Sequence, residues 1–326
     1  MNADLIKRLF RGIFSEDIVS LKKLANLIIN EERRLGHDKL ANTLEHISVT
    51  EKTRFIAKDS NGHGGFASLP TTKRDHLQLV SCIPRENLKH HMILPEDVEA
   101  RLISVENEFF AQDRLGKYNL IPKKKILLHG APGCGKTLTA ERLAWNLGLP
   151  LLKVRFDALL SSYFGESASN LRAVFDCTLR APVVLLLDEC DFIARSRVTT
   201  QDVGEVPRIV NMLLTLLDEY NSPGLVIATT NLKIQLDEAL FRRFDEVIEL
   251  PMPVIVEREK VLRMTLSAIP FDKEINLHEI AQKLDNCSYA NIVLIAQKAA
   301  KYSVLAGHKK VKTEFFEQSI SESIKY

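Results

Sequence analysis

One stretch, Lys123 to Leu138, constrains what this chain can fold into more than any other; it reads K-K-K-I-L-L-H-G-A-P-G-C-G-K-T-L. A short apolar run, Ile126 to Leu128, leads into a glycine-rich segment of the pattern G-x-x-x-x-G-K-[ST], and a helix-forming stretch follows. Glycines let successive backbone N–H groups turn inward toward phosphate oxygens, and the N-terminal end of the next helix adds positive potential. The order strand, loop, helix therefore predicts a phosphate-binding loop.

The position of each residue in this loop predicts its contact. Lys136 is placed to reach the β and γ phosphates of a nucleotide, and the Thr137 hydroxyl is placed to hold Mg²⁺. Cys134 occupies a variable position, and we interpret it as a tolerated small residue rather than a redox switch. The residues predicted to contact the nucleotide are Gly130, Ala131, Pro132, Gly133, Cys134, Gly135, Lys136, Thr137 and Leu138.

A second diagnostic segment, Val183 to Asp191, reads V-V-L-L-L-D-E-C-D. Its apolar half predicts a buried strand with two carboxylates at the C-terminal end, which is where parallel sheets bind ligands. Asp188 is predicted to hold Mg²⁺ through the water shell of the ion. Glu189 is predicted to orient or deprotonate the water that attacks the γ phosphate.

Apolar runs recur along the middle of the chain with helical stretches between them. Such alternation predicts a parallel sheet covered by helices on both faces, hence an α/β fold. The runs after the phosphate loop are Leu151 to Val154, Val183 to Leu187, Leu225 to Ala228 and Val247 to Leu250. After Pro251 and Pro253 the pattern is helical only, which predicts a separate small all-α domain.

The 326 residues are enough for two or three domains. We predict a short helical N-terminal region over residues 1–50, where charged and apolar residues alternate at helical spacing. A polar linker follows over residues 51–92. The large α/β domain is predicted over 93–250 and the small helical domain over 251–326.

Composition excludes several classes of protein. The net charge is +2, from 44 basic and 42 acidic residues, so no global field favours nucleic acid or an anionic membrane. No apolar stretch reaches the roughly 18 residues of a membrane span. Charges near the N-terminus argue against a signal peptide, and five cysteines without a C-x-x-C pair suit a reducing compartment. We therefore expect a cytoplasmic protein.

Two later motifs complete the pattern, A-T-T-N at Ala228 to Asn231 and L-D-E-A-L-F-R-R-F-D at Leu236 to Asp245. With the phosphate loop and the acid pair they resemble, over Pro95 to Tyr326, the AAA+ ATPases, in particular the AAA clade proper of protein-remodelling and unfolding hexamers. This resemblance implies a P-loop NTPase sheet with a helical lid, ATP and Mg²⁺ as ligands, and hydrolysis to ADP and phosphate in a homo-oligomeric ring. It implies that Asn231 is the sensor of the attacking water or γ phosphate.

The resemblance also assigns the arginines of the second of these motifs. Arg242 and Arg243 would reach across a subunit boundary into the ATP of a neighbouring copy, where a delocalised, permanently charged group stabilises the transition state. In this chain they are adjacent, whereas the family often separates them by Pro-Gly. Which of the two contacts the γ phosphate is left open.

A segment between the apolar runs 151–154 and 183–187, Leu160 to Arg172, resembles the aromatic-hydrophobic-glycine pore loop of this clade. Tyr163 and Phe164 would then grip an extended polypeptide, and Gly165 would allow the tight turn that presents them. The alternative is that both rings are ordinary core aromatics. At Cys287 to Ile292 the arginine of other AAA+ groups is missing, which favours protein remodelling over clamp loading or replication initiation.

The leading hypothesis is an ATP-driven ring that unfolds or remodels a protein threaded past Tyr163. Two alternatives are a nucleic-acid-handling module and an ATP-gated assembly switch for a partner enzyme. Any proteolysis must come from a separate chain, because H-E-I-A-Q at His278 to Gln282 fails the zinc-protease pattern H-E-x-x-H. The whole chain also resembles bacterial stand-alone ATPases found beside a subtilisin-like serine protease in antiphage (antiviral) defence pairs.

Overall fold

The computed structural model describes residues 69–72, 75–161, 166–191, 205–231, 238–267, 269, 275–308 and 310–323. The chain divides into two compact units, Met1–Ala67 and Ser68–Tyr326, and the described residues all belong to the second. The helical region predicted over residues 1–50 lies outside the described residues.

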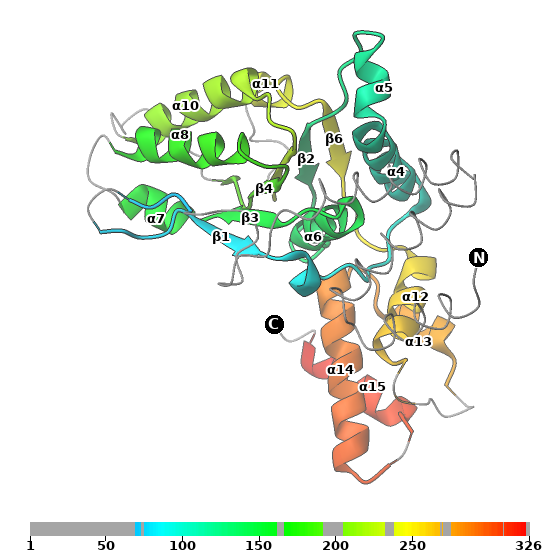
Figure 1. Cartoon of the computed structure of the whole chain (residues 1–326). Helices are drawn as coiled ribbons and strands as arrows, with labels where there is room; N and C mark the ends of the chain where they lie inside the picture. Colours follow the sequence, from blue (N-terminus) through cyan, green and yellow to red (C-terminus); the bar gives the residue numbers. More distant parts are fainter. Residues whose placement is uncertain are drawn as a thin grey trace, which may run out of the picture. The chain divides into compact units, whose positions relative to one another are not determined.

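A six-stranded sheet with the strand order β1-β3-β4-β5-β2-β6 forms the centre of the larger domain (Figure 1). Every neighbouring pair is parallel except β1 and β3, which are antiparallel. The strands are β1 (Val80–Ile83), β2 (Lys125–His129), β3 (Leu151–Val154), β4 (Val184–Leu187), β5 (Leu225–Thr230) and β6 (Glu246–Glu249). The sheet predicted from the apolar runs is therefore confirmed, with one antiparallel edge strand added.

That edge strand corrects the predicted linker over residues 51–92. Val80 to Ile83 pairs with Leu151 to Val154, and Val80 is fully buried. Residues Val80–Ile83 of the supposed linker therefore belong to the sheet. The four residues of this edge strand are too few to show a recognisable alternation of apolar and polar side chains in the sequence. Whether they form a strand is decided by their pairing with β3, which lies far away in the sequence.

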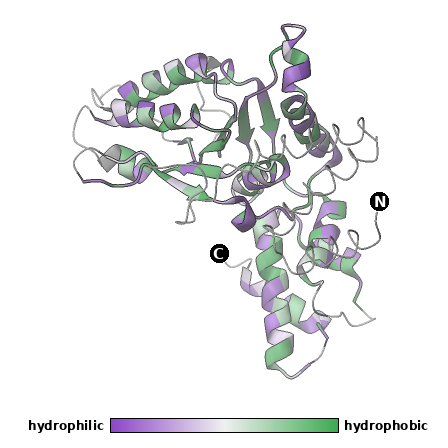
Figure 2. Cartoon of the chain, viewed as in Figure 1, coloured by the Kyte–Doolittle hydropathy of each residue, from purple (hydrophilic) through white to green (hydrophobic). Residues whose placement is uncertain are grey.

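Helices cover both faces of the sheet because its central strands are apolar on both sides. Helices α4 (Glu96–Phe110) and α6 (Lys136–Leu147) share one core with side chains of β2, β4 and β5. Helices α8 (Ser167–Thr178) and α10 (Glu205–Glu219) pack together on the other side (Figure 1). Figure 2 shows the strands coloured hydrophobic, while the helices carry both hydrophilic and hydrophobic residues. Short elements complete this domain: η1 (Arg85–Asn87), α5 (Gln112–Gly116), α7 (Phe156–Ser161) and α11 (Glu238–Phe241).

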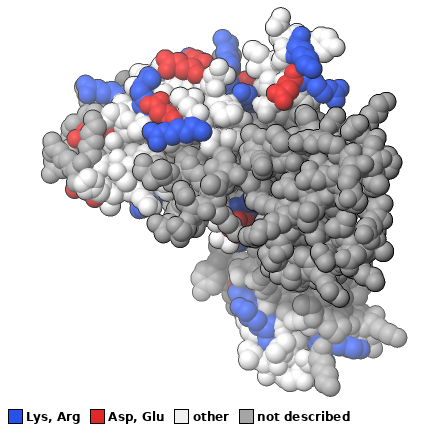
Figure 3. Space-filling model, viewed as in Figure 1, with Lys and Arg blue, Asp and Glu red and all other residues white. Residues whose placement is uncertain are grey.

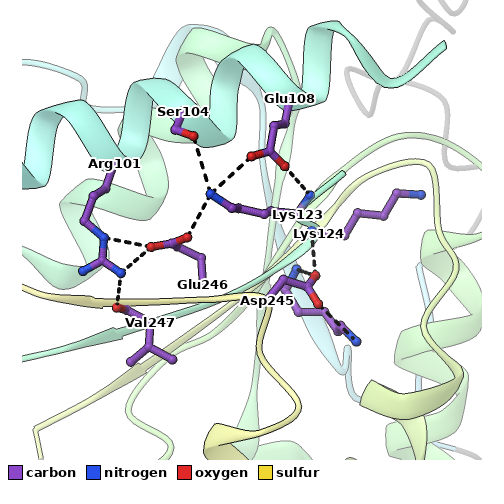
Figure 4. Close-up of polar contacts among 9 residues, drawn as sticks. Arg101, Ser104, Glu108, Lys123, Lys124, Asp245, Glu246 and Val247 are labelled. Atoms are coloured by element: carbon purple, nitrogen blue, oxygen red, sulfur yellow. Dashed lines mark hydrogen bonds and ion pairs between the residues drawn. The ribbon is translucent and has the colours of Figure 1, made fainter. Parts of the chain in front are cut away.

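Ion pairs attach α4 to the start of β2 and to β6 (Figure 4). The Lys123 ammonium lies 3.2 Å from Glu108 of α4 and 3.0 Å from Glu246 of β6. Arg101 also donates to Glu246 and, at 2.6 Å, to the carbonyl of Val247. Lys123, the first residue of the basic run before the phosphate loop, is therefore paired with acidic residues inside the domain.

The C-terminal part is helical, as predicted. Its helices are α12 (Ile255–Thr265), α13 (Leu277–Lys283), α14 (Tyr289–Leu305) and α15 (Thr313–Ser323), which enclose a second core around the fully buried Phe316. The side chain of Ser288 caps α14 by accepting from the backbone N–H of Asn291 at 3.3 Å. The start of α14 also lies beside the phosphate loop, because the Ala290 N–H donates to the carbonyl of Gly133.

Candidate functional site

A cavity of about 920 Å³ lies where the phosphate loop, the C-terminal ends of β4 and β5, and the helical lid meet. Its lining combines the polar residues of the two predicted motifs with apolar residues from the lid and from the segment before α4. The lining residues used below are Gly133, Cys134, Lys136, Thr137, Asp188, Glu189, Thr229, Asn231, Tyr289 and Ala290. The volume is in the range that proteins use for cofactor-sized ligands.

Lys136 begins α6 and is only 8% exposed. Its ammonium donates to the carbonyls of Gly130 at 2.8 Å and Ala131 at 2.9 Å. These two hydrogen bonds fix the Lys136 side chain against the backbone of the phosphate loop. Burial lowers the pKa of Lys136 from its ordinary value, although the nearby acidic groups oppose this shift. Burial raises the pKa of Cys134, which keeps that loop residue a thiol rather than a reactive thiolate.

Gly133 joins the phosphate loop to the lid. Its carbonyl accepts from the backbone N–H of Ala290 at 3.1 Å, and its φ of +77° lies in the left-handed region. A Cβ added at Gly133 would lie 2.5 Å from the Ser288 hydroxyl and 3.2 Å from the Cβ of Ala290. Only glycine therefore permits this close approach of the lid to the loop.

Asp188 follows β4, and its side chain is 9% exposed. Its carboxylate accepts from the hydroxyls of Thr137 at 2.9 Å and Thr229 at 2.7 Å, and from the Lys153 ammonium at 2.6 Å. Burial alone would raise the pKa of Asp188, but the hydrogen bonds from Lys153, Thr229 and Thr137 outweigh it and hold the pKa below its ordinary value. The carboxylate is therefore ionised at neutral pH and lies beside the loop threonine.

These residues fit a nucleotide and Mg²⁺. The structure brings a threonine hydroxyl and one ionised carboxylate together beside a phosphate-loop lysine, and Mg²⁺ in nucleotide sites takes few protein oxygens, completing its shell with phosphates and water. The curled loop backbone and the start of α6 supply the donors that phosphate requires.

Glu189 has an unusual backbone for a residue with a side chain, because its φ is +56°. Its N–H donates to the Thr229 hydroxyl at 2.8 Å. Asn231, at the end of β5, donates its backbone N–H and its side-chain amide to Asp191, each at 2.9 Å. Glu189, which follows β4, and Asn231, which follows β5, both line the cavity. Each is hydrogen-bonded to the segment of the other.

The remaining predicted residues lie elsewhere. Among the described residues that line the cavity there is no arginine. Arg242 is exposed, and Arg243 is half-buried with its guanidinium donating to Asp218 of α10 at 2.9 Å. The three pore-loop residues fall outside the described ranges; they are Tyr163, Phe164 and Gly165.

Our reasoning from the sequence missed three residues that hold the site together, Lys153, Asp191 and Thr229. Asp191 and Thr229 stood within the quoted motifs D-E-C-D and A-T-T-N, so their position next to predicted site residues was a usable signal. Lys153 carried a weaker signal, a single lysine inside the apolar run of β3. The register of β3 and β5 with β4 brings Lys153 and Thr229 to Asp188, while Asp191 follows the acid pair in the sequence and accepts from Asn231.

Comparison with known proteins points to one family. A family model described as "ATPase family associated with various cellular activities (AAA)" matches residues 126–252. The chain is 31% identical over 323 residues to an uncharacterised AAA family ATPase, y4kL, of Sinorhizobium fredii, and the match covers 98% of this chain and 94% of that protein. It is 34% identical over 213 residues to a proteasome-activating nucleotidase of Methanosphaerula palustris, which covers 63% of this chain and 52% of that protein.

None of the helices in the described part of the chain is both long enough and apolar enough to cross a bilayer.

Proposed function

This chain belongs to the AAA family of ATPases, and from that premise we propose that it hydrolyses ATP at the Asp188–Glu189 pair and uses the cycle to remodel a protein. One observation supports this assignment above the others. The acid pair, the phosphate-loop lysine and the loop threonine all line one cavity that the lid helps to close. ATP and Mg²⁺ are the ligands that this set of groups is suited to bind.

Each residue has a role in this proposal. Lys136 and the loop N–H groups bind and orient the triphosphate, while Thr137 and Asp188 hold Mg²⁺. When bound, Mg²⁺ would neutralise charge that develops on the phosphate oxygens. Glu189 orients the attacking water and accepts its proton.

The substitution Glu189→Gln removes the carboxylate charge and tests whether this residue acts as the general base in ATP hydrolysis. We expect the variant to bind ATP with unchanged affinity and to lose turnover by about 10²-fold or more, because general-base catalysis contributes at least that factor. Glu219→Gln, at a 56% exposed side chain of α10, is the matched control for losing one negative charge. Full ATPase activity in Glu189→Gln would remove this residue from the mechanism.

Assembly of several copies into a ring would give Arg242 and Arg243 a role in catalysis. The exposed position of Arg242, next to Arg243 on the short segment after α11, suits a contact with the nucleotide of a neighbouring copy. A guanidinium supplied in trans is worth about 10³ to 10⁵ in rate, so an isolated subunit would be nearly inactive. We propose a homo-oligomer, most simply a hexamer.

The proposed client is a protein rather than a nucleic acid. The match to a nucleotidase named for proteasome activation supports an ATPase that delivers proteins to a separate protease, and for this chain we propose a serine protease as that partner. Basic and acidic side chains of the described residues are interspersed in the upper part of Figure 3, in line with the net charge of +2.

Gripping of the client is assigned to Tyr163 and Phe164. Tyr163→Ala should retain ATPase activity and lose substrate unfolding, whereas Tyr163→Phe should retain both, because the ring provides the grip. Unfolding of a partner substrate is measured by the loss of its fluorescence signal. If Tyr163→Ala unfolds the substrate at the normal rate, gripping belongs to other residues.

The protease partner has its own experiment. The hydrolysis-dead Glu189→Gln protein should hold its nucleotide-bound assembly, so proteins that co-purify with it from native extract identify clients and partners. A protease enriched with this variant and lost with the binding-dead Lys136→Ala variant would support the defence-pair arrangement.

A further inference from the structure

We propose that Thr229 is a positioning residue that fixes Asp188 and Glu189 relative to each other, so that the metal-holding and water-orienting carboxylates act as one unit. This inference rests on the proposed function, because it assumes that both acids serve ATP hydrolysis. Thr229 lies in β5, is 1% exposed, and lines the cavity.

The hydrogen bonds of the Thr229 hydroxyl leave only one arrangement of its proton. The hydroxyl accepts from the Glu189 backbone N–H at 2.8 Å, and that group can only donate. The hydroxyl proton is therefore directed at the Asp188 carboxylate, whose nearer oxygen lies at 2.7 Å. One side chain thus connects the carboxylate of the first acid to the backbone of the second.

The strand register explains why this residue reaches both acids. Strands β4 and β5 are parallel, with Leu187 opposite Ala228, so Thr229 follows beside the turn that begins at Asp188. The backbone carbonyl of Thr229 also accepts from the N–H of Cys190 at 2.8 Å. Thr229 therefore holds three consecutive residues of the turn, one through each polar contact.

The turn needs such support because Glu189 has a left-handed backbone with φ +56°. Residues with a Cβ rarely adopt this conformation unless the surroundings enforce it. Loss of the Thr229 hydroxyl would leave the Glu189 N–H without this acceptor and would release the turn toward an ordinary conformation. The Glu189 carboxylate would then point in a different direction, and Asp188 would lose one of its donors.

Misplacing a catalytic group by about 1 Å can cost about 10²-fold in rate. We therefore expect Thr229→Val, which keeps the shape and removes the hydroxyl, to lower kcat by about 10- to 100-fold with a much smaller change in KM. Thr229→Ser keeps the hydroxyl and should stay within about threefold of the normal kcat. Thr229→Ala, which differs from Thr229→Ser by that hydroxyl alone, should resemble the valine variant.

A second readout does not depend on turnover. Binding of a fluorescent, non-hydrolysable ATP analogue is titrated with Mg²⁺ in the full chain. Because Thr229 donates to Asp188 and does not belong to the phosphate loop, the valine variant should need about three- to tenfold more Mg²⁺ for half-maximal binding. Binding in EDTA should be unchanged.

Thr178→Val is the matched control for removing a buried threonine hydroxyl. Thr178 is fully buried, its hydroxyl donates to the Phe175 carbonyl at 2.7 Å, and it does not line the cavity. The Thr178→Val variant should have the normal kcat and the normal Mg²⁺ response, even if its melting temperature falls. If Thr229→Val does not fold, comparing Thr229→Ser with Thr229→Ala measures the same effect, the loss of the hydroxyl.

Normal kcat and Mg²⁺ response in Thr229→Val, or equal defects in the serine and alanine variants, would overturn the role of Thr229. Asp188→Asn and Glu189→Gln are assayed beside them. If those two variants hydrolyse ATP normally, the proposed function itself fails. If they are inactive while Thr229→Val is normal, only the inference about Thr229 fails.

Discussion

The carboxylate of Asp191 accepts two hydrogen bonds from Asn231, one from its backbone N–H and one from its side-chain amide, each at 2.9 Å. The Thr230 hydroxyl donates to the same carboxylate at 2.6 Å. With its nitrogen directed at Asp191, the amide of Asn231 has its oxygen left to accept from a donor in the cavity. Asp191 therefore selects which end of the Asn231 amide is available to an attacking water.

Asp191→Asn should disturb this arrangement without changing the size of the side chain. The new amide cannot accept from Asn231 through both of its ends, so the Asn231 amide should rotate or lose a partner. We expect kcat to fall by about tenfold, the scale of one lost positioning interaction, with ATP affinity unchanged. Steady-state ATPase and equilibrium nucleotide binding measure the two quantities.

Asp113→Asn, at an exposed position of α5, controls for the loss of one negative charge. It should leave both quantities normal. Loss of ATP binding in Asp191→Asn, or a normal kcat, would contradict the positioning role of Asp191.

The ion pair between Lys153 and Asp188 predicts how stability depends on pH. The folded pKa of Asp188 lies below its ordinary value of 3.8, since the donors of this site, led by Lys153, outweigh its burial. Its stabilising contribution is therefore fully present above the ordinary pKa and is lost as pH falls through the folded pKa. Lys153→Met should raise the folded pKa, so this contribution should become smaller and be lost at a higher pH.

The effect should be modest, because the Lys153 side chain is 41% exposed and such pairs contribute up to about 1 kcal/mol. Thermal unfolding measured from about pH 6 down to below the ordinary pKa of 3.8 tests this effect, because a paired carboxylate loses its contribution as it becomes protonated. Lys283→Met, which removes an exposed lid ion pair to Glu317, is the control. Parallel curves for Lys153→Met and the normal chain would argue against the pair as a determinant of acid stability.

Local signals were enough to predict most of the fold and the polar groups of the site. The phosphate loop was predictable because its glycines, Lys136 and Thr137 are consecutive and lie between a strand and a helix. The parallel strands were predictable because burial on both faces requires nearly continuous apolar runs, as in Val183 to Leu187.

The rest depends on contacts between segments distant in the sequence. Nothing near Thr229 indicates that its hydroxyl meets Asp188, because 41 residues separate them and the register of β4 and β5 decides their contact. The contact of Ser288 with Gly133 likewise depends on the packing of the lid. The antiparallel pairing of Val80 to Ile83 is the clearest example, because the same four residues would be a linker without their neighbour strand.

Gly133→Ala should separate the lid from the phosphate loop. Its Cβ would lie 2.5 Å from the Ser288 hydroxyl, which is closer than atoms pack, so the start of α14 would have to shift. We expect ATP affinity to fall by at least about tenfold, because the loop donors and the lid would no longer close on one ligand. Isothermal titration of the full chain with a non-hydrolysable ATP analogue measures this loss.

Gly148→Ala controls for backbone strain alone. Gly148 also has a left-handed backbone, with φ +73°, but a Cβ there meets nothing within 4 Å. This variant should lose about 1 kcal/mol of stability, the usual cost of replacing glycine at such a position, and keep its ATP affinity. Equal losses of affinity in the two variants would mean that strain, rather than the Ser288 contact, explains the result at Gly133.

Mixing two inactive variants tests whether neighbouring copies share each ATP. Lys136→Ala lacks a working phosphate loop, and the double variant Arg242→Ala/Arg243→Ala lacks the guanidinium groups; each should be nearly inactive alone. An equal mixture should recover up to about a quarter of normal turnover, the share of head-to-tail interfaces that pair an intact loop with intact arginines. Melting temperature must be compared as well, because Arg243 also donates to Asp218. No recovery, together with full activity of isolated subunits, would exclude a shared site.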